Sequence, residues 1–367
     1  MKILWLTFKD LKNPTSGGAE KVNEGLIKKL SDEGHEVILL VAGFRDCKNE
    51  EIIDGYKIIR LGNKWTVYWL AFMYYKKNLK SWADLVIDEV NTIPFFVKFY
   101  AKEKNILLVH QLCRQIWFYE MFFPLNIVGY FIEPFYLKIL SDKKVITISE
   151  STKNDLIKFG FKKENIFIIR NFIDTNPIEN LSDVKKYENF TILSLGAVRK
   201  MKRTKDIIKS FELAKLKIPH LRLIIAGNDQ TNYSKEVLLL ANKSPFKNDI
   251  SFLGKVSLEK KMELMQKCHI LSVTSVKEGW GLVVTEANSQ GTPAIAYNVD
   301  GLRDSIKNSE TGLLSIKNNP QSLSEQIVSL LKNKEKYEEI RKNCWKFSLD
   351  FDMDKGYKGF LNIIKNI

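Results

Sequence analysis

The hydrophobic and polar positions of this 367-residue chain follow two alternating patterns from one end to the other. Short apolar runs, typical of buried strands, are separated by longer segments with an apolar residue every three or four positions, typical of amphipathic helices. In segment 19–33, for example, Val22, Leu26, Ile27 and Leu30 form one apolar stripe. Such alternation predicts parallel sheets with helices on both faces. The predicted strands are 3–7, 37–41, 57–61, 85–87, 106–110, 145–148 and 166–169, then 190–195, 222–226, 250–253, 270–275 and 294–297.

The length of the chain and a break in this pattern predict two domains. The chain exceeds the usual length of one domain. Residues 174–188 carry a proline and scattered charge without periodicity, so we place the boundary there. The expected N-terminal domain spans 1–175 and the expected C-terminal domain spans 176–345, each an α/β domain with a doubly wound parallel sheet.

The composition excludes some classes of protein but does not identify the function. Hydrophobic residues make up 45% and charged residues 27%, which is ordinary for a globular protein with a core. The four cysteines are far apart and form no CxxC pair, which favours reduced thiols, a cytoplasmic location and no zinc site. The N-terminal apolar run is too short for a signal-peptide core, and no stretch is long and charge-free enough to span a bilayer.

The formal net charge of +14 favours an anionic partner. Nucleic acid is not indicated, because the lysines are spread over most predicted helices and no basic-region or RNA-binding motif is present. Three explanations stay open: an anionic lipid surface, a diphosphate ligand, and a lysine-rich solvated surface without a specific partner.

Two glutamates, Glu278 and Glu286, lie eight positions apart where the pattern predicts a loop entering a helix. Gly281 lets the backbone approach a ligand, and Leu282 and Val283 offer free N–H groups at the helix start to a diphosphate. Glu286, about one turn into the helix, can accept hydrogen bonds from a ribose diol. Glu278, on the loop, faces another part of the ligand. The same pattern also fits a glycine turn before a half-buried helix with ordinary surface glutamates.

In order and spacing, this region resembles the nucleotide-sugar half of the retaining family 4 glycosyltransferases, which have the GT-B fold. After the helix come Gly-Thr-Pro at 291–293, Asp-Gly-Leu-Arg-Asp at 300–304 and Glu-Thr-Gly-Leu-Leu at 310–314. The resemblance covers nearly the whole chain, and the glutamate pair with its flanks is its most specific part. Further matching segments are 16–20, 109–111, 148–151, 170–174 and 195–197.

The resemblance implies two facing Rossmann-like domains, with an acceptor on the N-terminal wall and a donor on the C-terminal wall of one cleft. It also implies that segment 346–367 crosses back to the first domain as a terminal helix. The implied activity is retaining transfer of a hexose-type sugar from a nucleotide-sugar donor to a sugar or lipid-linked acceptor. A nucleotide-sugar epimerase and an inactive sugar-nucleotide or membrane-binding protein remain open alternatives.

The leaving diphosphate requires positive charge as its bond to the sugar breaks. The family has an arginine soon after the first strand of the C-terminal domain and a lysine five positions later. Lys202 matches the lysine, whereas Ala197 stands in place of the arginine, and Arg199 is the expected substitute. We expect no metal and no cofactor. The Asp-x-Asp pattern at 350–354 lies away from both nucleotide-site loops, and helix capping explains it better.

Five residues of the N-terminal domain complete the expected site. His110 follows a strand, and the resemblance places a histidine there beside the transferred sugar. Gly17 and Gly18 precede a helix and permit close approach of the acceptor and of a donor phosphate, respectively. Asp88 and Glu89 follow another strand and are candidate acceptor contacts. A strand-end histidine, a glycine turn and solvated carboxylates also have purely structural explanations.

Residues 116–140 are dense in aromatic side chains. Glu120, Glu133 and two prolines exclude a membrane-spanning helix. An interfacial element that contacts lipid headgroups or a lipid-linked acceptor fits this composition, as does an aromatic core layer. We expect most of these side chains in the core. A second aromatic group at 65–75 and the basic surface keep peripheral contact with the inner face of a membrane open.

Overall fold

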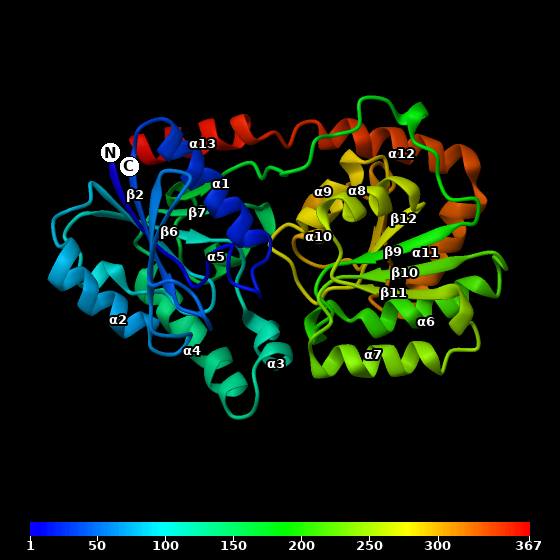
Figure 1. Ribbon diagram of the computed structural model, residues 1–367, viewed down its shortest axis with the longest axis horizontal. Helices are drawn as coiled ribbons and strands as arrows, with labels where there is room; N and C mark the ends of the chain where they lie inside the picture. Colours follow the sequence, from blue (N-terminus) through cyan, green and yellow to red (C-terminus); the bar gives the residue numbers. More distant parts are fainter. The chain divides into compact units, whose positions relative to one another are not determined.

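The computed structural model describes residues 1–367, which divide into two units. The first unit comprises Met1–Trp117, Phe123–Phe172 and Met353–Ile367, and the second comprises Phe118–Phe122 and Ile173–Asp352. Each unit is built around its own sheet with helices packed on it (Figure 1). The division near Ile173 falls just before the segment in which the sequence placed it.

The sheet of the first unit has eight strands in the order β3-β4-β2-β1-β5-β6-β7-β8. All neighbours pair in parallel except β3 and β4, which form an antiparallel hairpin at the edge. The sequence pattern did not predict β3, because its four residues show no apolar run and none of them is fully buried. The strands are β1 (Lys2–Leu6), β2 (Glu36–Ala42), β3 (Glu50–Ile53), β4 (Tyr56–Leu61), β5 (Leu85–Glu89), β6 (Lys104–Val109), β7 (Val145–Thr147) and β8 (Ile166–Ile168).

Helices cover both faces of this first sheet. Leu4, Val86 and Leu107 lie on one face according to the strand register, and they pack in cores that contain α2 (Val67–Tyr74) and α4 (Leu125–Leu140). Trp5 points to the opposite face, where its ring stacks on Phe360 with 5.7 Å between centroids. Phe360 belongs to the terminal helix α13 (Met353–Lys365), so the end of the chain returns to the first unit. α13 lies beside α1 (Gly18–Asp32).

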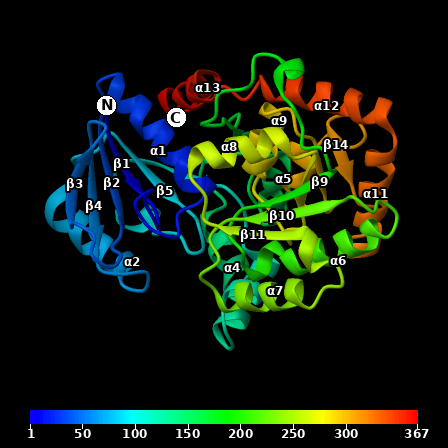
Figure 2. The ribbon, with the colours of Figure 1, turned by 45° about the vertical axis from the view of Figure 1, so that its right-hand side comes forward.

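The sheet of the second unit has six parallel strands in the order β11-β10-β9-β12-β13-β14. Helices α6, α7 and α11 cover one face, and α8, α9 and α10 cover the other (Figure 1 and Figure 2). The strands are β9 (Thr191–Leu195), β10 (Arg222–Ala226), β11 (Ile250–Gly254), β12 (Ile270–Val273), β13 (Ala294–Ala296) and β14 (Gly312–Leu314). The helices are α6 (Thr204–Lys215), α7 (Asn232–Asn242), α8 (Leu258–Lys267), α9 (Leu282–Ser289), α10 (Leu302–Ser305) and α11 (Pro320–Lys332).

Three more helices complete the set: α3 (Trp117–Glu120), α5 (Glu150–Lys158) and α12 (Lys334–Ser348). Residues 346–348 therefore end α12 in the second unit, and the returning helix starts only at Met353. No helix in the structure combines the length and the apolar composition needed to cross a membrane.

The aromatic segment 116–140 is mostly exposed, so the prediction that most of its side chains form a core was wrong. Trp117 and Tyr136 are buried, but Phe118, Tyr119, Phe122, Phe123, Phe131 and Phe135 are exposed. The reason lies in Glu133, whose buried carboxylate accepts hydrogen bonds from the Cys113 amide (2.7 Å) and from Trp117 Nε1 (3.0 Å). These bonds, together with the core packing of Tyr136, Leu137 and Leu140, hold one side of α4 against the protein and leave its other apolar side outward.

Candidate functional site

The loops that follow β9 and β12 are fixed to each other at the carboxyl end of the second sheet. The two strands are hydrogen-bonded neighbours, with Ile192 opposite Ile270. Thr274 Oγ1 donates to the carbonyl of Lys202 (2.8 Å), and the Val276 amide donates to the carbonyl of Met201 (2.8 Å). These bonds position Lys202 beside Glu278, although the two residues are far apart in the sequence.

Lys202 and Glu278 form an ion pair, with Lys202 Nζ against Glu278 Oε1. The Ser275 hydroxyl donates to the same carboxylate oxygen at 2.5 Å. Burial raises the pKa of Glu278, but the charge of Lys202, the hydrogen bonds from Lys202 and Ser275, and the charge of Arg199 outweigh it and lower the pKa overall. Glu278 is therefore an anion that is held in one orientation.

The Asp-Gly-Leu-Arg-Asp motif supports the backbone of the Glu278 loop. The Glu278 amide donates to the carbonyl of Asp300 at 3.1 Å, and Lys277 Nζ contacts Asp300 Oδ2 at 2.6 Å. Gly301 has a φ of +77°, and a Cβ at this position would lie 2.3 Å from the carbonyl oxygen of Glu278. Only glycine combines this φ with such a close approach, which gives the motif a positioning role.

The helix α9 starts directly after this loop, at Leu282, and the preceding residue, Gly281, has a φ of +90°. Gly281 has no side chain that could cap the helix, so Leu282 and Val283 begin a helix N-terminus without a side-chain cap. Glu286 lies one turn further on and is largely buried. Its carboxylate pairs with Lys261 Nζ of α8 at 2.7 Å. Sequence reasoning missed Lys261, because no spacing pattern connects α8 with the glutamate pair.

The basic residues after β9 differ in their exposure and in the carboxylates with which they pair. Arg203 is committed to the fold, since it pairs with Asp206 at 2.7 Å and lies 5.0 Å from the centroid of the Tyr297 ring. Arg199 is 42% exposed at its side chain, pairs with Glu120 at 3.6 Å, and precedes the short helical turn that carries Lys202. Ala197 is exposed in the same loop. The charge of Arg199 lowers the pKa of Glu278, and its role as the substitute arginine stays a prediction.

In the first unit, three buried polar side chains form a chain of hydrogen bonds. Asn23 of α1 donates from Nδ2 to Glu89 Oε2 at 2.6 Å, and its Oδ1 accepts from His110 Nε2 at 2.9 Å. Burial lowers the pKa of His110 to about 4 and raises the pKa of Glu89 to about 8. Both groups are therefore neutral near pH 7, and their 3.8 Å approach is not an ion pair. The second ring nitrogen of His110, Nδ1, is an acceptor without a hydrogen-bond partner.

The remaining predicted residues of the first unit have mixed surroundings. Gly17 and Gly18 are exposed at the start of α1, and the Gly17 amide donates to Glu20 Oε2 at 2.6 Å. Asp88 is fully buried, and its two oxygens accept from the amides of Phe95 (2.8 Å) and Val97 (3.0 Å). This geometry gives Asp88 a structural role in place of the acceptor contact that was predicted.

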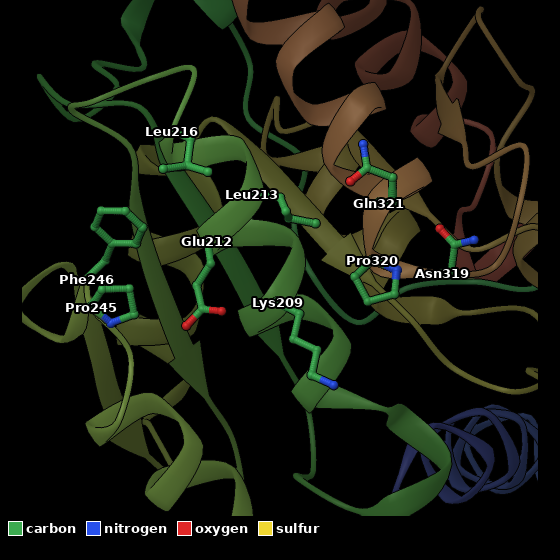
Figure 3. A pocket seen from close by; sticks show the side chains of 9 residues that line it. All are labelled: Lys209, Glu212, Leu213, Leu216, Pro245, Phe246, Asn319, Pro320 and Gln321. Atoms are coloured by element: carbon green, nitrogen blue, oxygen red, sulfur yellow. The ribbon is translucent and has the colours of Figure 1, made fainter.

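A separate hollow lies on the second unit between α6, α11 and the segment before β11 (Figure 3). It has an apolar lining that includes Leu213, Leu216 and Phe246, with Lys209 and Glu212 at its side. None of its lining residues belongs to the candidate site, so we do not assign the donor to it.

Two family models match the chain in succession. The model described as Glycosyltransferase Family 4 matches residues 16–177, and the model described as Glycosyl transferases group 1 matches residues 179–346. Together with the two parallel-sheet units, these matches show that the chain belongs to the family 4 glycosyltransferases with the GT-B fold.

Individual relatives cover nearly the full chain. An uncharacterized glycosyltransferase of Haemophilus influenzae is 25% identical over 95% of this chain and 97% of its own length. The N,N'-diacetylbacillosaminyl-diphospho-undecaprenol alpha-1,3-N-acetylgalactosaminyltransferase of Campylobacter jejuni is 25% identical over 93% and 95%. Among solved structures, Anabaena HepE in complex with UDP and glucose superposes with a TM-score of 0.75 at 18% identity, covering 100% of both chains. This last likeness concerns the fold.

Proposed function

We propose that this glycosyltransferase moves a hexose-type sugar from a nucleotide-sugar donor to a sugar or lipid-linked acceptor, with retention of configuration and without a metal. One observation carries the proposal: Lys202, Glu278 and the uncapped start of α9 are gathered at the carboxyl end of the second sheet. Ligands of open parallel sheets bind at that end of the strands.

The residues that bind the donor are assigned from their charges and hydrogen-bonding groups. Lys202 and the N–H groups of Leu282 and Val283 supply positive charge for a diphosphate. When the bond between the anomeric carbon and the diphosphate breaks, the electron pair leaves with the phosphate oxygen, and this growing negative charge needs those donors. Glu278, held by Lys202 and Ser275, accepts hydrogen bonds from the hydroxyls of the transferred sugar. Glu286, held by Lys261, accepts them from the ribose.

The acceptor side is assigned to the first unit. The unpaired Nδ1 of neutral His110, which the resemblance places beside the transferred sugar, can accept a hydrogen bond from a hydroxyl of that sugar, and Asn23 fixes the ring for that contact. At the start of α1, Gly17 leaves room for the acceptor and Gly18 for a donor phosphate. The name of the Campylobacter relative describes a lipid-diphosphate acceptor, which supports a lipid-linked acceptor as one candidate here.

Absence of a metal requirement is part of the proposal, since Lys202, Arg199 and the start of α9 already provide positive charge for the diphosphate. Transfer is expected to proceed at the same rate with and without excess EDTA. A loss of activity on chelation that magnesium or manganese restores would contradict this part of the proposal and leave the donor assignment standing.

The activity itself is tested by following donor consumption with and without candidate acceptors. Nucleotide sugars that raise the melting temperature, because they bind the native state, are the donors to use. Consumption that depends on an acceptor supports transfer. Interconversion of the donor sugar without an acceptor would indicate an epimerase, and binding without turnover under any condition would indicate an inactive binding protein.

A further inference from the structure

The helix α4 presents a continuous apolar face to solvent. Phe131 and Phe135 are 63% and 70% exposed, and Ile127, Ile132 and Ile139 are exposed on the same side of the helix. The opposite side carries the buried Glu133 described above. Tyr136, Leu137 and Leu140 on that side also pack in the core, so α4 is apolar on both sides and only its inward side is covered by protein. Isolated exposed apolar residues are common, but a face of this kind marks an interaction surface.

The same surface continues onto α2 through the segment 95–100. Tyr68 and Phe72 of α2 contact Phe95 and Tyr100, with ring centroids 4.8 and 5.1 Å apart, respectively. On the other side of this segment, Lys98 Nζ donates to the carbonyl of Ile139 in α4 at 2.7 Å. Because α2 and α4 cover the same face of the first sheet, their outward sides both point away from it. We call the following exposed side chains the apolar platform: Trp69, Met73, Phe99, Phe131, Phe135 and Ile139.

Basic residues border the platform. No acidic residue occurs between positions 55 and 83, a stretch that contains Lys64, Lys76, Lys77 and Lys80. Lysine ammonium groups lie next to aromatic rings at the border, 5.0 Å from Trp65 for Lys64 and 5.7 Å from Phe72 for Lys76. Lysines whose stems follow apolar surface while their charges reach outward are typical of groups at a membrane interface.

We infer that the apolar platform lies on an anionic lipid bilayer. The aromatic and aliphatic side chains enter the boundary between headgroups and acyl chains, and the bordering lysines contact the headgroup phosphates. A second copy of the chain is a poorer occupant, because pairing two platforms would bring the lysines of both borders together, and the carboxylate of Asp142 at this border is already paired with Lys98. The inference is independent of the proposed sugar transfer, since it concerns a different surface.

Co-flotation with vesicles tests the inference on the full chain. Wild-type protein is expected to float with vesicles that contain phosphatidylglycerol, and less with vesicles of phosphatidylcholine alone or at high salt. The double variant Phe131→Ser with Phe135→Ser is expected to lower the partition coefficient by roughly tenfold or more, because two apolar side chains are removed from the interface. Both side chains are exposed, so the variant is expected to keep its thermal unfolding curve.

A matched control replaces two exposed apolar residues of α7 in the second unit, Leu238→Ser with Leu239→Ser, and is expected to bind vesicles as the wild type does. A charge variant, Lys76→Gln with Lys77→Gln, is expected to lose the preference for phosphatidylglycerol. No flotation of the wild type, or equal flotation of the phenylalanine variant, would overturn the inference. So would a wild-type dimer that the phenylalanine variant converts to a monomer, because the occupant would then be a second copy. Donor consumption with a water-soluble acceptor, measured in parallel, reports on sugar transfer separately.

Discussion

Lys202 and Glu278 are ion-paired between the loops that follow two neighbouring strands, β9 and β12. The pair connects a cation suited to a diphosphate with a carboxylate suited to sugar hydroxyls. In a nucleotide sugar these two groups are joined at the anomeric carbon, where the bond breaks. Under the proposed function, the reacting bond of the donor is therefore expected near the point where the two side chains meet.

Replacement of Lys202 by alanine is expected to lower turnover by roughly a hundredfold or more, since a donor to the developing charge of the leaving group is lost. Affinity for free nucleoside diphosphate is expected to fall as well. Lys200→Ala is the matched control, because Lys200 is exposed in the same helical turn and is expected to change neither quantity strongly. Equal effects of the two variants would show that the loss reflects general positive charge in this loop.

The ion pair also predicts a dependence of stability on pH. The pKa of Glu278 in the folded protein is below its ordinary value of 4.5, so the folded state holds the proton less readily than the unfolded state. The stabilisation is fully present above that ordinary value and is lost as the pH falls through the lowered pKa. The difference in melting temperature between wild type and Glu278→Gln is therefore expected to be constant near neutral pH and to change on acidification below about pH 4.5. Parallel curves down to low pH would contradict the pairing.

Glu89 predicts the opposite trend. Its pKa rises from 4.5 to about 8 on burial, so the folded state keeps a proton that the unfolded state loses. This contribution to stability is fully present below the ordinary pKa of 4.5. It is lost progressively as the pH rises from 4.5 to about 8. Relative to Glu89→Gln, the wild type is expected to lose up to about 1.4 kcal/mol of unfolding free energy per pH unit within that window. Denaturant unfolding at several pH values measures this. His110 is common to both proteins, and a pH-independent difference would contradict a neutral Glu89.

Much of the fold followed from the sequence because buried strands and amphipathic helices have distinct periodicities. The helix predicted at 19–33 differs from α1 by one residue at each end. The edge strand β3 was missed, since an edge strand with exposed side chains has no apolar run to reveal it. The aromatic segment was assigned to the core because composition alone does not tell which side of a helix faces inward. That orientation depends on the contacts of buried Glu133 with Cys113 and Trp117.

The candidate site was predicted where residues are neighbours in sequence and missed where the fold joins distant segments. Spacing and resemblance pointed to Glu278, Glu286 and Lys202. Lys261, the partner of Glu286, and the Asn23 link between Glu89 and His110 come from other elements, and no local pattern indicates them. Asp88 was chosen for its place after a strand, but the backbone amides of Phe95 and Val97 occupy its carboxylate.

The central claim, that the two glutamates hold different parts of one nucleotide-sugar donor, is tested most directly by calorimetric titration with free nucleoside diphosphate. The diphosphate to use is the one that binds the wild type most tightly, and a thermal unfolding curve checks each variant. Glu286→Ala is expected to weaken this affinity roughly tenfold to a hundredfold, because a charged hydrogen bond to the ribose is lost. Glu278→Ala is expected to leave the affinity nearly unchanged while turnover falls, because its partner is the reacting sugar. Loss of nucleotide affinity in Glu278→Ala but not in Glu286→Ala would reverse the roles, and no change in either variant would contradict the site.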